Sequence, residues 1–379
     1  MHASADAPAP RRYLVAPDKF KGTLTGAQAA AAITRGVHRA DPSARVRELP
    51  FADGGEGTVD AMIHAGAQRI VGVVAGPLGT PVTASWALRD GAAVIELAEA
   101  SGLRHVVPTP ATALAADTTG TGQLIAAALD RGITEVVIGL GGSASTDGGF
   151  GALRALGVRF LTAQGEPVTR TTEIPAITRI DTTGLHPGLA TATIDLCADV
   201  RSPLTGPRGA AAVFAPQKGA DAGTVAILGD RLAHLARHYA PMAPGRDVLG
   251  AGGAAGGFAA GAMAVLGARL RGGGEVLAEV LGLAEAIGES DVVIVGEGSL
   301  DEQSRFGKTP VGIARIARSL GVPTIAVVGV TTLGPDALLE EGISTIVSAA
   351  EMAPTPAAAR ARASTYVERA AAAAVAALG

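Results

Sequence analysis

The sequence predicts an α/β protein in which a doubly wound parallel sheet is interrupted by a second, inserted α/β domain. The chain has 379 residues, which is long enough for two domains with separate apolar cores. Short β-branched runs repeatedly end in small residues and a charged or Gly-rich turn, and a helical stretch follows, as in a parallel sheet covered on both faces. A middle region instead has closely spaced strands joined by short turns.

The first predicted unit of the doubly wound sheet lies near the start of the chain. A strand over residues 13–16 leads into the charged turn 17–22, and the Ala-rich segment 25–40 has helical spacing with Thr25 as its expected N-cap. Similar apolar strands are predicted at residues 136–138, 291–295, 322–329 and 343–349. The Ala-rich end, residues 357–378, is predicted to be a helix packed on the sheet.

Strands of the middle region have the spacing of antiparallel hairpins. They are predicted at residues 69–74, 81–88 and 92–97, with turns at Gly76-Pro77 and Asp90-Gly91. We therefore expect a discontinuous doubly wound domain of residues 1–65 and 284–379, and an inserted α/β domain of residues 66–283. The segment 117–151 suits the sheet of either domain.

Composition and charge disfavour several classes of function. A net charge of -4, from 31 basic and 35 acidic residues, disfavours sequence-independent binding to nucleic acid. The single cysteine, Cys197, cannot form an internal disulfide, so a cytoplasmic location is expected. Residues 251–268 carry no charge, but their Gly and Ala content indicates a buried segment rather than a membrane span. Residues 1–12 do not resemble a secretory signal.

Ligands of open parallel sheets bind outside the carboxyl ends of the strands. Charged or Gly-rich turns follow several predicted strands and contain Lys19, Gly141, Gly142, Ser143, Asp199 and Asp301. The turn 139–144 fits the loose pattern G-x-G-x-x-A, whose glycines let backbone amides close on a phosphate at the start of a helix. The alternative interpretation is a tight turn that binds no ligand.

A P-loop is absent, because residue 302 is Glu where the first Gly of that motif would stand. A kinase with this sequence would therefore assemble its phosphate site from separate loops, with lysines as point charges. Lys19, Lys218 and Lys308 are the candidates, since each lies beside a Gly or Pro turn. The alternative for each lysine is a solvated surface position.

Carboxylates suited to phosphoryl transfer occur in several turns. This reaction needs a divalent cation held by carboxylates and a group that orients or deprotonates the accepting hydroxyl. The candidates for these roles are Asp147, Asp199 and Asp301. Asp53 and Glu56, in a Gly-rich turn, suit hydrogen bonding to substrate hydroxyls or to metal-bound water. Alternatively, Glu56 and Asp60 stabilise the helix expected to begin near Thr58.

Eight segments resemble motifs of the class I glycerate kinases, in the order of that family and across nearly the whole chain. They are A-P-D-K-F-K-G-T-L at Ala16, A-D-G-G-E-G-T at Ala52, G-P-L-G at Gly76, D-T-T-G-T-G-Q-L-I at Asp117, G-G-S-A-S-T-D-G-G at Gly141, A-P-Q-K-G-A at Ala215, A-G-G-A-A-G-G at Ala251 and G-E-G-S-L-D-E-Q-S at Gly296. The chain departs from the commonest pattern at Thr146 and Ser202, where Asn is usual, and both keep a small polar side chain.

The resemblance implies a flavodoxin-like domain with an inserted α/β domain, and transfer of the γ-phosphate of ATP to D-glycerate with Mg²⁺ to give 2-phosphoglycerate. Glycerate is expected in a cleft between the domains. The residues expected to bind the nucleotide are Gly141, Gly142, Ser143, Lys218 and Lys308, and those expected to bind glycerate are Asp53 and Glu56. The expected catalytic residues are Asp199 as base, Lys19 and Asp301, and the expected magnesium ligands are Asp147 and Asp301.

Two other functions fit parts of the sequence. The Gly-rich turn after Ile138 would suit an NAD(P)-linked hydroxy-acid oxidoreductase, but no clear acidic partner for a ribose follows it. A nonenzymatic hydroxy-acid-binding protein would use the carboxylates only to hold hydroxyl groups. In each case the expected partner is a small hydroxy acid rather than nucleic acid or a membrane, and self-association is left open.

Overall fold

The chain forms two compact units, each with its own sheet. The computed structural model describes residues 9–52, 54–198, 202–302, 309–334 and 337–378. Unit 1 comprises residues 1–53 and 277–379, and unit 2 comprises residues 54–276. The boundaries expected from the sequence, 65/66 and 283/284, differ from the divisions in the structure, which lie at 53/54 and 276/277. The turn after residue 53 therefore belongs to unit 2. Independent folding of the two units as domains stays a prediction.

The sheet of unit 1 has five strands, and all neighbouring pairs are parallel. Its strands are β1 (Arg12–Pro17), β2 (Arg45–Glu48), β11 (Val292–Leu300), β12 (Thr324–Thr331) and β13 (Ile343–Ser348). Their spatial order is β13-β12-β11-β1-β2. Counted within the unit, this is the order 2-1-3-4-5 of flavodoxin-like sheets, with the switch point between β1 and β11. The predicted flavodoxin-like α/β class is confirmed.

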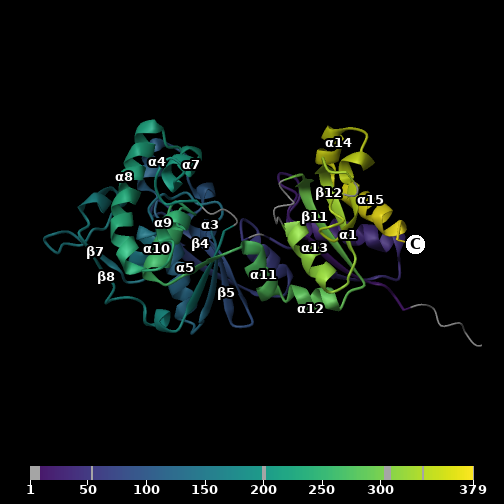
Figure 1. Ribbon diagram of the computed structural model, residues 1–379, viewed down its shortest axis with the longest axis horizontal. Helices are drawn as coiled ribbons and strands as arrows, with labels where there is room; N and C mark the ends of the chain where they lie inside the picture. Colours follow the sequence, from purple (N-terminus) through teal and green to yellow (C-terminus); the bar gives the residue numbers. More distant parts are fainter. Residues whose placement is uncertain (1–8, 53, 199–201, 303–308, 335–336, 379) are drawn as a thin grey trace, which may run out of the picture. The chain divides into compact units, whose positions relative to one another are not determined.

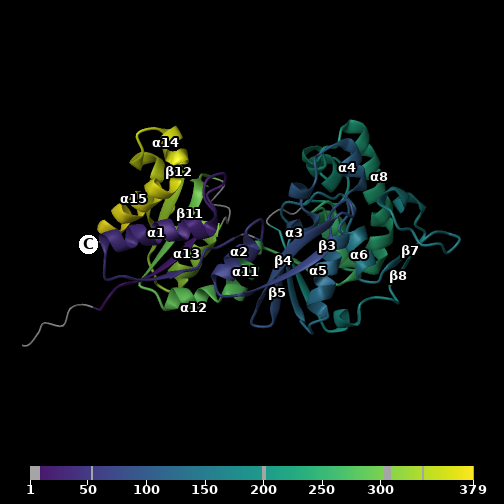
Figure 2. The same cartoon turned by 180° about the vertical axis from the view of Figure 1, so that it is seen from behind.

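Helices cover both faces of this sheet. Its helices are α1 (Gly26–Ala40), α12 (Leu283–Gly288), α13 (Thr309–Ser319), α14 (Pro356–Ala361) and α15 (Ala363–Ala376). Helices α1 and α15 pack together on one face, and α13 packs on β11 and β12 from the other (Figures 1 and 2). Tyr13 and Val15 of β1 join the core under α1 and α15, while Leu14 and Ala16 are buried toward the opposite face.

Helix α1 begins where the sequence predicts. The Thr25 hydroxyl accepts a hydrogen bond from the Gln28 amide at 3.2 Å, and the Gln28 side chain accepts one from the Thr25 amide at 3.0 Å. This reciprocal capping box satisfies two amides that the first helical turn leaves without partners. The prediction of Thr25 as N-cap is confirmed.

Gly36 allows α1 and α15 to approach closely. A Cβ atom at Gly36 would lie 2.3 Å from the Glu368 carbonyl oxygen and 2.6 Å from the Ala371 Cβ. We expect Gly36→Ala to lower the free energy of unfolding by about 1–3 kcal/mol, because one helix must move. Urea denaturation measures this change. The matched control is Gly312→Ala in α13, where a Cβ meets nothing within 4 Å and the gain in helix propensity should be neutral or stabilising. Equal effects of the two substitutions would contradict the prediction.

The main sheet of unit 2 has six strands and is mixed. Its strands are β3 (Gln68–Ala75), β4 (Pro81–Arg89), β5 (Ala92–Glu96), β6 (Glu135–Gly139), β9 (Thr193–Cys197) and β10 (Arg269–Arg271), in the order β10-β9-β6-β5-β4-β3. The predicted hairpins are confirmed, because β3, β4 and β5 pair antiparallel. Strand β5 also pairs in parallel with β6, and β6 with β9. A separate two-stranded sheet consists of β7 (Arg159–Leu161) and β8 (Arg179–Asp181).

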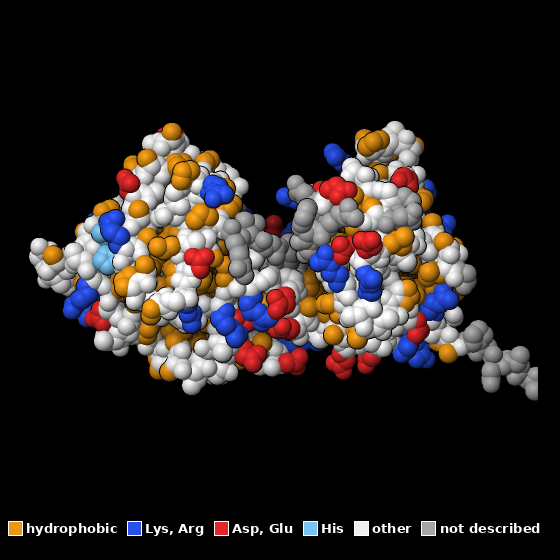
Figure 3. All heavy atoms as spheres, in the orientation of Figure 1, with side chains coloured by type: hydrophobic (Ala, Val, Ile, Leu, Met, Phe, Trp, Pro, Cys, Tyr) orange, Lys and Arg blue, Asp and Glu red, His pale blue; other side chains and the backbone are white. Residues whose placement is uncertain are grey.

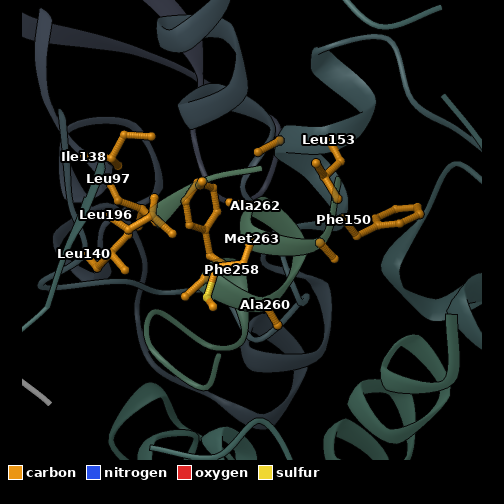
Figure 4. Close-up of a cluster of buried hydrophobic side chains, with 14 of the residues drawn as sticks. Leu97, Ile138, Leu140, Phe150, Leu153, Leu196, Phe258, Ala260, Ala262 and Met263 are labelled. Carbon is orange, nitrogen blue, oxygen red and sulfur yellow. The ribbon is translucent and has the colours of Figure 1, made fainter. Parts of the chain in front are cut away.

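Helices supply most of the buried core residues of unit 2. The helices are α2 (Thr58–His64), α3 (Leu97–Ser101), α4 (Pro110–Ala115), α5 (Thr119–Leu129), α6 (Phe150–Ala155), α7 (Ala210–Phe214), α8 (Ala222–Tyr239), α9 (Val248–Ala251), α10 (Phe258–Val265) and, across the boundary with unit 1, α11 (Gly273–Leu281). Figure 4 shows part of the core, where side chains from β6, β9, α6 and α10 meet. The uncharged stretch around α10 is buried, as predicted, with Phe258 and Met263 in this cluster.

The surface carries both signs of charge. On the face shown in Figure 3, Lys and Arg side chains lie interspersed with Asp and Glu side chains in each unit. Among the described residues, no helix combines the length and the apolar character needed to cross a membrane.

Candidate active site

The carboxyl ends of three neighbouring strands of unit 2 lie level with one another. Glu96 of β5 is paired in register with Gly139 of β6, and Gly139 with Cys197 of β9. The turn 54–57 packs against this edge. A Cβ at Gly139 would lie 2.3 Å from the Gly54 carbonyl oxygen, and one at Gly141 would lie 2.9 Å from the Gly55 Cα. The structure therefore brings the Gly-rich turn after β6 next to the turn that contains Glu56.

The predicted phosphate turn, residues 141–143, is fixed by its neighbours. Gly142 has φ +71°, a left-handed conformation that favours glycine. Its carbonyl oxygen accepts a hydrogen bond from the Leu103 amide at 2.9 Å, and the Ala144 amide donates to the Ser101 carbonyl oxygen at 2.9 Å. The turn does not open a helix directly, because α6 begins only at Phe150. The structure therefore does not place this turn at the start of a helix, and its role in phosphate binding stays a prediction.

Lys218 supplies a buried amine to the same turn. Its Nζ donates to the Ser143 Oγ at 2.8 Å and to the Ser145 carbonyl oxygen at 2.5 Å. The residue is only 3% exposed. Burial lowers the pKa of Lys218 to about 7, and the charge of Asp147 acts in the opposite direction. Two residues predicted independently for the nucleotide site, Ser143 and Lys218, are thus in contact.

Asp147 is the acceptor for four donors at the start of α6. Its Oδ2 accepts from the Thr118 amide at 3.0 Å, the Thr118 hydroxyl at 2.8 Å and the Gly151 amide at 3.0 Å, and its Oδ1 accepts from the Gly149 amide at 3.2 Å. Burial raises the pKa of this carboxyl, and Asp117 raises it further. Because both oxygens are already engaged, the geometry favours a structural role over the predicted role as a magnesium ligand.

Lys19 and Asp301 both follow strands of unit 1 that end at one edge. Strands β1 and β11 pair in parallel up to Pro17 and Gly296, and the Asp18 amide donates to the Gly296 carbonyl oxygen at 2.8 Å. Lys19 lies in the loop after β1, and Asp301 comes directly after the last residue of β11. This edge is the topological switch point, where ligands of doubly wound sheets bind.

Three predicted site residues, Asp53, Asp199 and Lys308, lie outside the described residues. Of the residues that the structure describes, no three or more His, Cys, Asp or Glu side chains are grouped so as to hold a metal ion. Asp301, in unit 1, and Asp147, in unit 2, stay predictions as magnesium ligands.

Sequence reasoning missed Glu96, which is only 4% exposed at the end of β5. Its Oε1 accepts a hydrogen bond from the Val59 amide of α2 at 2.7 Å. Asp60 lies in the first turn of α2, as the alternative for Glu56 and Asp60 expected, and its carboxylate also pairs with Arg69 at 2.6 Å. The signal for Glu96 was a lone acidic residue at the end of an apolar strand. As part of a predicted antiparallel hairpin, this strand has no expected place at the ligand edge of a parallel sheet.

Comparisons with known proteins agree on one family. The family model described as the glycerate kinase family matches residues 13–379. The glycerate kinase of Halalkalibacterium halodurans is 41% identical over 342 residues, which cover 88% of this chain and 90% of that protein. The glycerate 2-kinase of Escherichia coli is 41% identical, with 89% and 90% covered. A crystal structure described as a glycerate kinase 2 from Salmonella typhimurium LT2 matches with a TM-score of 0.83 and 36% identity, over 97% of this chain and 98% of that one.

Proposed function

The chain belongs to the glycerate kinase family and is a phosphotransferase, and from this premise we propose that it converts D-glycerate and ATP into 2-phosphoglycerate and ADP. The oxygen of the glycerate C2 hydroxyl attacks the γ-phosphorus, the bond from that phosphorus to the bridging oxygen breaks, and the hydroxyl proton passes to a base. The name of the Escherichia coli relative, glycerate 2-kinase, supports the choice of the 2 position.

The contact between Lys218 and Ser143 carries this proposal within the structure. It joins a buried amine, whose protonated form bound phosphates would favour, to a turn with backbone amides, without a P-loop. A fixed cation in a position shielded from water stabilises phosphate charge more strongly than a solvated lysine does. We assign the phosphates of ATP to Lys218 and residues 141–143.

The other roles follow from position in the chain and are proposals of the same kind. We assign Lys19 and Asp301 to catalysis, with Asp301 as a magnesium ligand, and Glu56 to binding of glycerate. Magnesium, when bound, would neutralise charge that develops on the transferring phosphoryl group. Asp199 as base, Asp53 as a glycerate ligand and Lys308 as a phosphate ligand complete the proposal from outside the described residues.

A direct assay tests the reaction. The purified protein is incubated with ATP, Mg²⁺ and D-glycerate, ADP release is followed by a coupled assay, and the product is resolved into 2- and 3-phosphoglycerate. We expect ADP and 2-phosphoglycerate in equal amounts, and no ADP above background when glycerate is omitted. Formation of 3-phosphoglycerate would overturn the choice of hydroxyl, and absence of ADP would overturn the proposed substrate.

Membership of the family favours the kinase over the oxidoreductase and the nonenzymatic binding protein that the sequence left open. We place the enzyme in the cytoplasm, where ATP is supplied and where a chain with one buried cysteine needs no disulfide.

A further inference from the structure

The start of helix α2 lacks a capping side chain of its own. Gly57, the N-cap residue, has φ +96° and makes no side-chain hydrogen bond to the helix. An uncapped helix start leaves amides without acceptors, which is unfavourable where water is excluded. Val59, the second residue of α2, is buried, so its amide needs an acceptor from the protein.

Glu96 supplies that acceptor from a different element. Its Oε1 lies 2.7 Å from the Val59 amide nitrogen, and the side chain is almost fully buried at the end of β5. The bond therefore ties the start of α2 to the strand edge at which the Gly-rich turn after β6 also lies.

The turn 54–57 lies between the hydrogen bond from Val59 to Glu96 and the carboxyl ends of β5, β6 and β9. A Cβ at Gly54 would meet the Cys197 Cβ at 2.5 Å, so the turn is packed against the end of β9. The Gly55 carbonyl oxygen accepts from the Thr58 hydroxyl at 2.7 Å, which links the turn to the first residue of α2. Glu56 is exposed in the middle of this fixed segment. A displacement of α2 would consequently displace Glu56.

We infer that Glu96 is a positioning residue, whose acceptor oxygen holds the start of α2 and thereby fixes the turn that presents Glu56 to the hydroxy acid. The inference rests on the proposed function, in which Glu56 contacts glycerate. In this role Glu96 acts through α2 and the turn 54–57, and not by contact with the hydroxy acid.

The acceptor oxygen of Glu96, rather than its negative charge, holds the start of α2. Burial raises the pKa of Glu96 to about 7, and the backbone hydrogen bonds from Val59 and Gly57 only partly oppose that effect. At neutral pH a large share of the molecules therefore carries a protonated Glu96, whose carbonyl oxygen still accepts a hydrogen bond. Gln has such an oxygen at the same reach, whereas Asp keeps the charge but is shorter by one methylene group.

Two substitutions distinguish the effect of the length of the Glu96 side chain from the effect of its charge. Glu96→Gln should keep the KM for D-glycerate close to that of the wild type. Glu96→Asp should raise it about 10- to 100-fold, because the acceptor no longer reaches the Val59 amide. In Glu96→Asp, kcat and the KM for ATP should change much less than the KM for glycerate. The opposite ranking, with Gln impaired and Asp normal, would overturn the inference in favour of a role for the charge.

A matched control distinguishes positioning from general stability. Asp221 caps α8 through the Thr224 amide at 2.8 Å, the same kind of interaction in the same unit. Asp221→Ala should lower thermal stability and leave the KM for glycerate unchanged. If it raises that KM as much as Glu96→Asp does, the effect of Glu96 is structural and the inference fails.

Amide hydrogen exchange tests the inference without enzyme activity. Peptides covering residues 57–61 should exchange at the wild-type rate in Glu96→Gln and faster in Glu96→Asp, while peptides from α8 stay unchanged. Wild-type protection in Glu96→Asp would overturn the inference even in a protein that phosphorylates another acid. If Glu96→Asp loses protection but the wild type does not phosphorylate glycerate, the hydrogen bond between Glu96 and α2 is supported and the proposed substrate is rejected.

Discussion

Replacing Lys218 by Met should lower kcat/KM for phosphoryl transfer by about 10²- to 10³-fold, the usual effect of removing one fixed electrostatic donor from an active site. Met keeps the length and the apolar stem of the side chain but removes the ammonium that contacts Ser143 and the Ser145 carbonyl oxygen. The charge acts where water is excluded, so solvent cannot replace it. Steady-state kinetics with ATP and D-glycerate measures the change.

A control for this substitution is Arg131→Met. Arg131 donates to the Ala127 carbonyl oxygen at 3.0 Å from an exposed position, and its loss should leave kcat/KM near the wild-type value. A folded Lys218→Met protein with wild-type kinetics would remove Lys218 from the phosphate site.

Lys218 should also make stability depend on pH in a defined direction. Its pKa is about 7 in the folded protein and 10.5 in the unfolded chain, so the unfolded chain binds more protons between these values. The free energy of unfolding of the wild type should therefore rise with pH across this window, relative to Lys218→Met. Urea denaturation at pH 6.5 and pH 9 measures the difference in free energy of unfolding between the wild type and Lys218→Met at each pH. Identical differences at both pH values would contradict burial of this amine.

Local signals in the sequence predict most of the fold. Each strand of the unit 1 sheet that was predicted is an apolar run with a turn after it, so its position follows from nearby residues alone. The hairpins of unit 2 follow in the same way from the turns at Gly76-Pro77 and Asp90-Gly91. The capping box at Thr25 needs only two residues three apart.

Local signals in the sequence do not predict contacts between distant segments. The parallel pairing of β5 with β6 places Glu96 on the ligand edge, but about forty residues separate the two strands and no turn specifies their register. The Gly beside Lys218 marks it as a candidate, but its burial depends on the distant loop at Ser143 and Ser145. For Asp147, an acidic residue in a Gly-rich turn suggested a metal ligand, because its main partner, Thr118, is remote in sequence.

Removing the Asp147 carboxylate should destabilise unit 2 strongly. Asp147→Ala leaves four donors without an acceptor inside the protein, and we expect the free energy of unfolding to fall by about 3–5 kcal/mol. Asp147→Asn should lose only about 1–3 kcal/mol. Its amide oxygen can replace Oδ2 and accept from Thr118 and Gly151, so that only the Gly149 amide faces another donor. Urea denaturation of both variants measures the two losses.

The graded loss separates a structural carboxylate from a metal ligand. A ligand to magnesium would behave in the opposite way, because Asn would keep the stability of the metal-free protein while the Mg²⁺ concentration needed for half-maximal activity rose steeply. Thr118→Val is the matched variant, since it leaves the carboxylate in place and removes a hydroxyl that donates to Asp147 and accepts from the Ala152 amide at 3.0 Å. Under the structural interpretation it should destabilise the protein by about 1–2 kcal/mol and leave the Mg²⁺ requirement unchanged. A raised Mg²⁺ requirement in Asp147→Asn, at wild-type stability, would return Asp147 to the metal site.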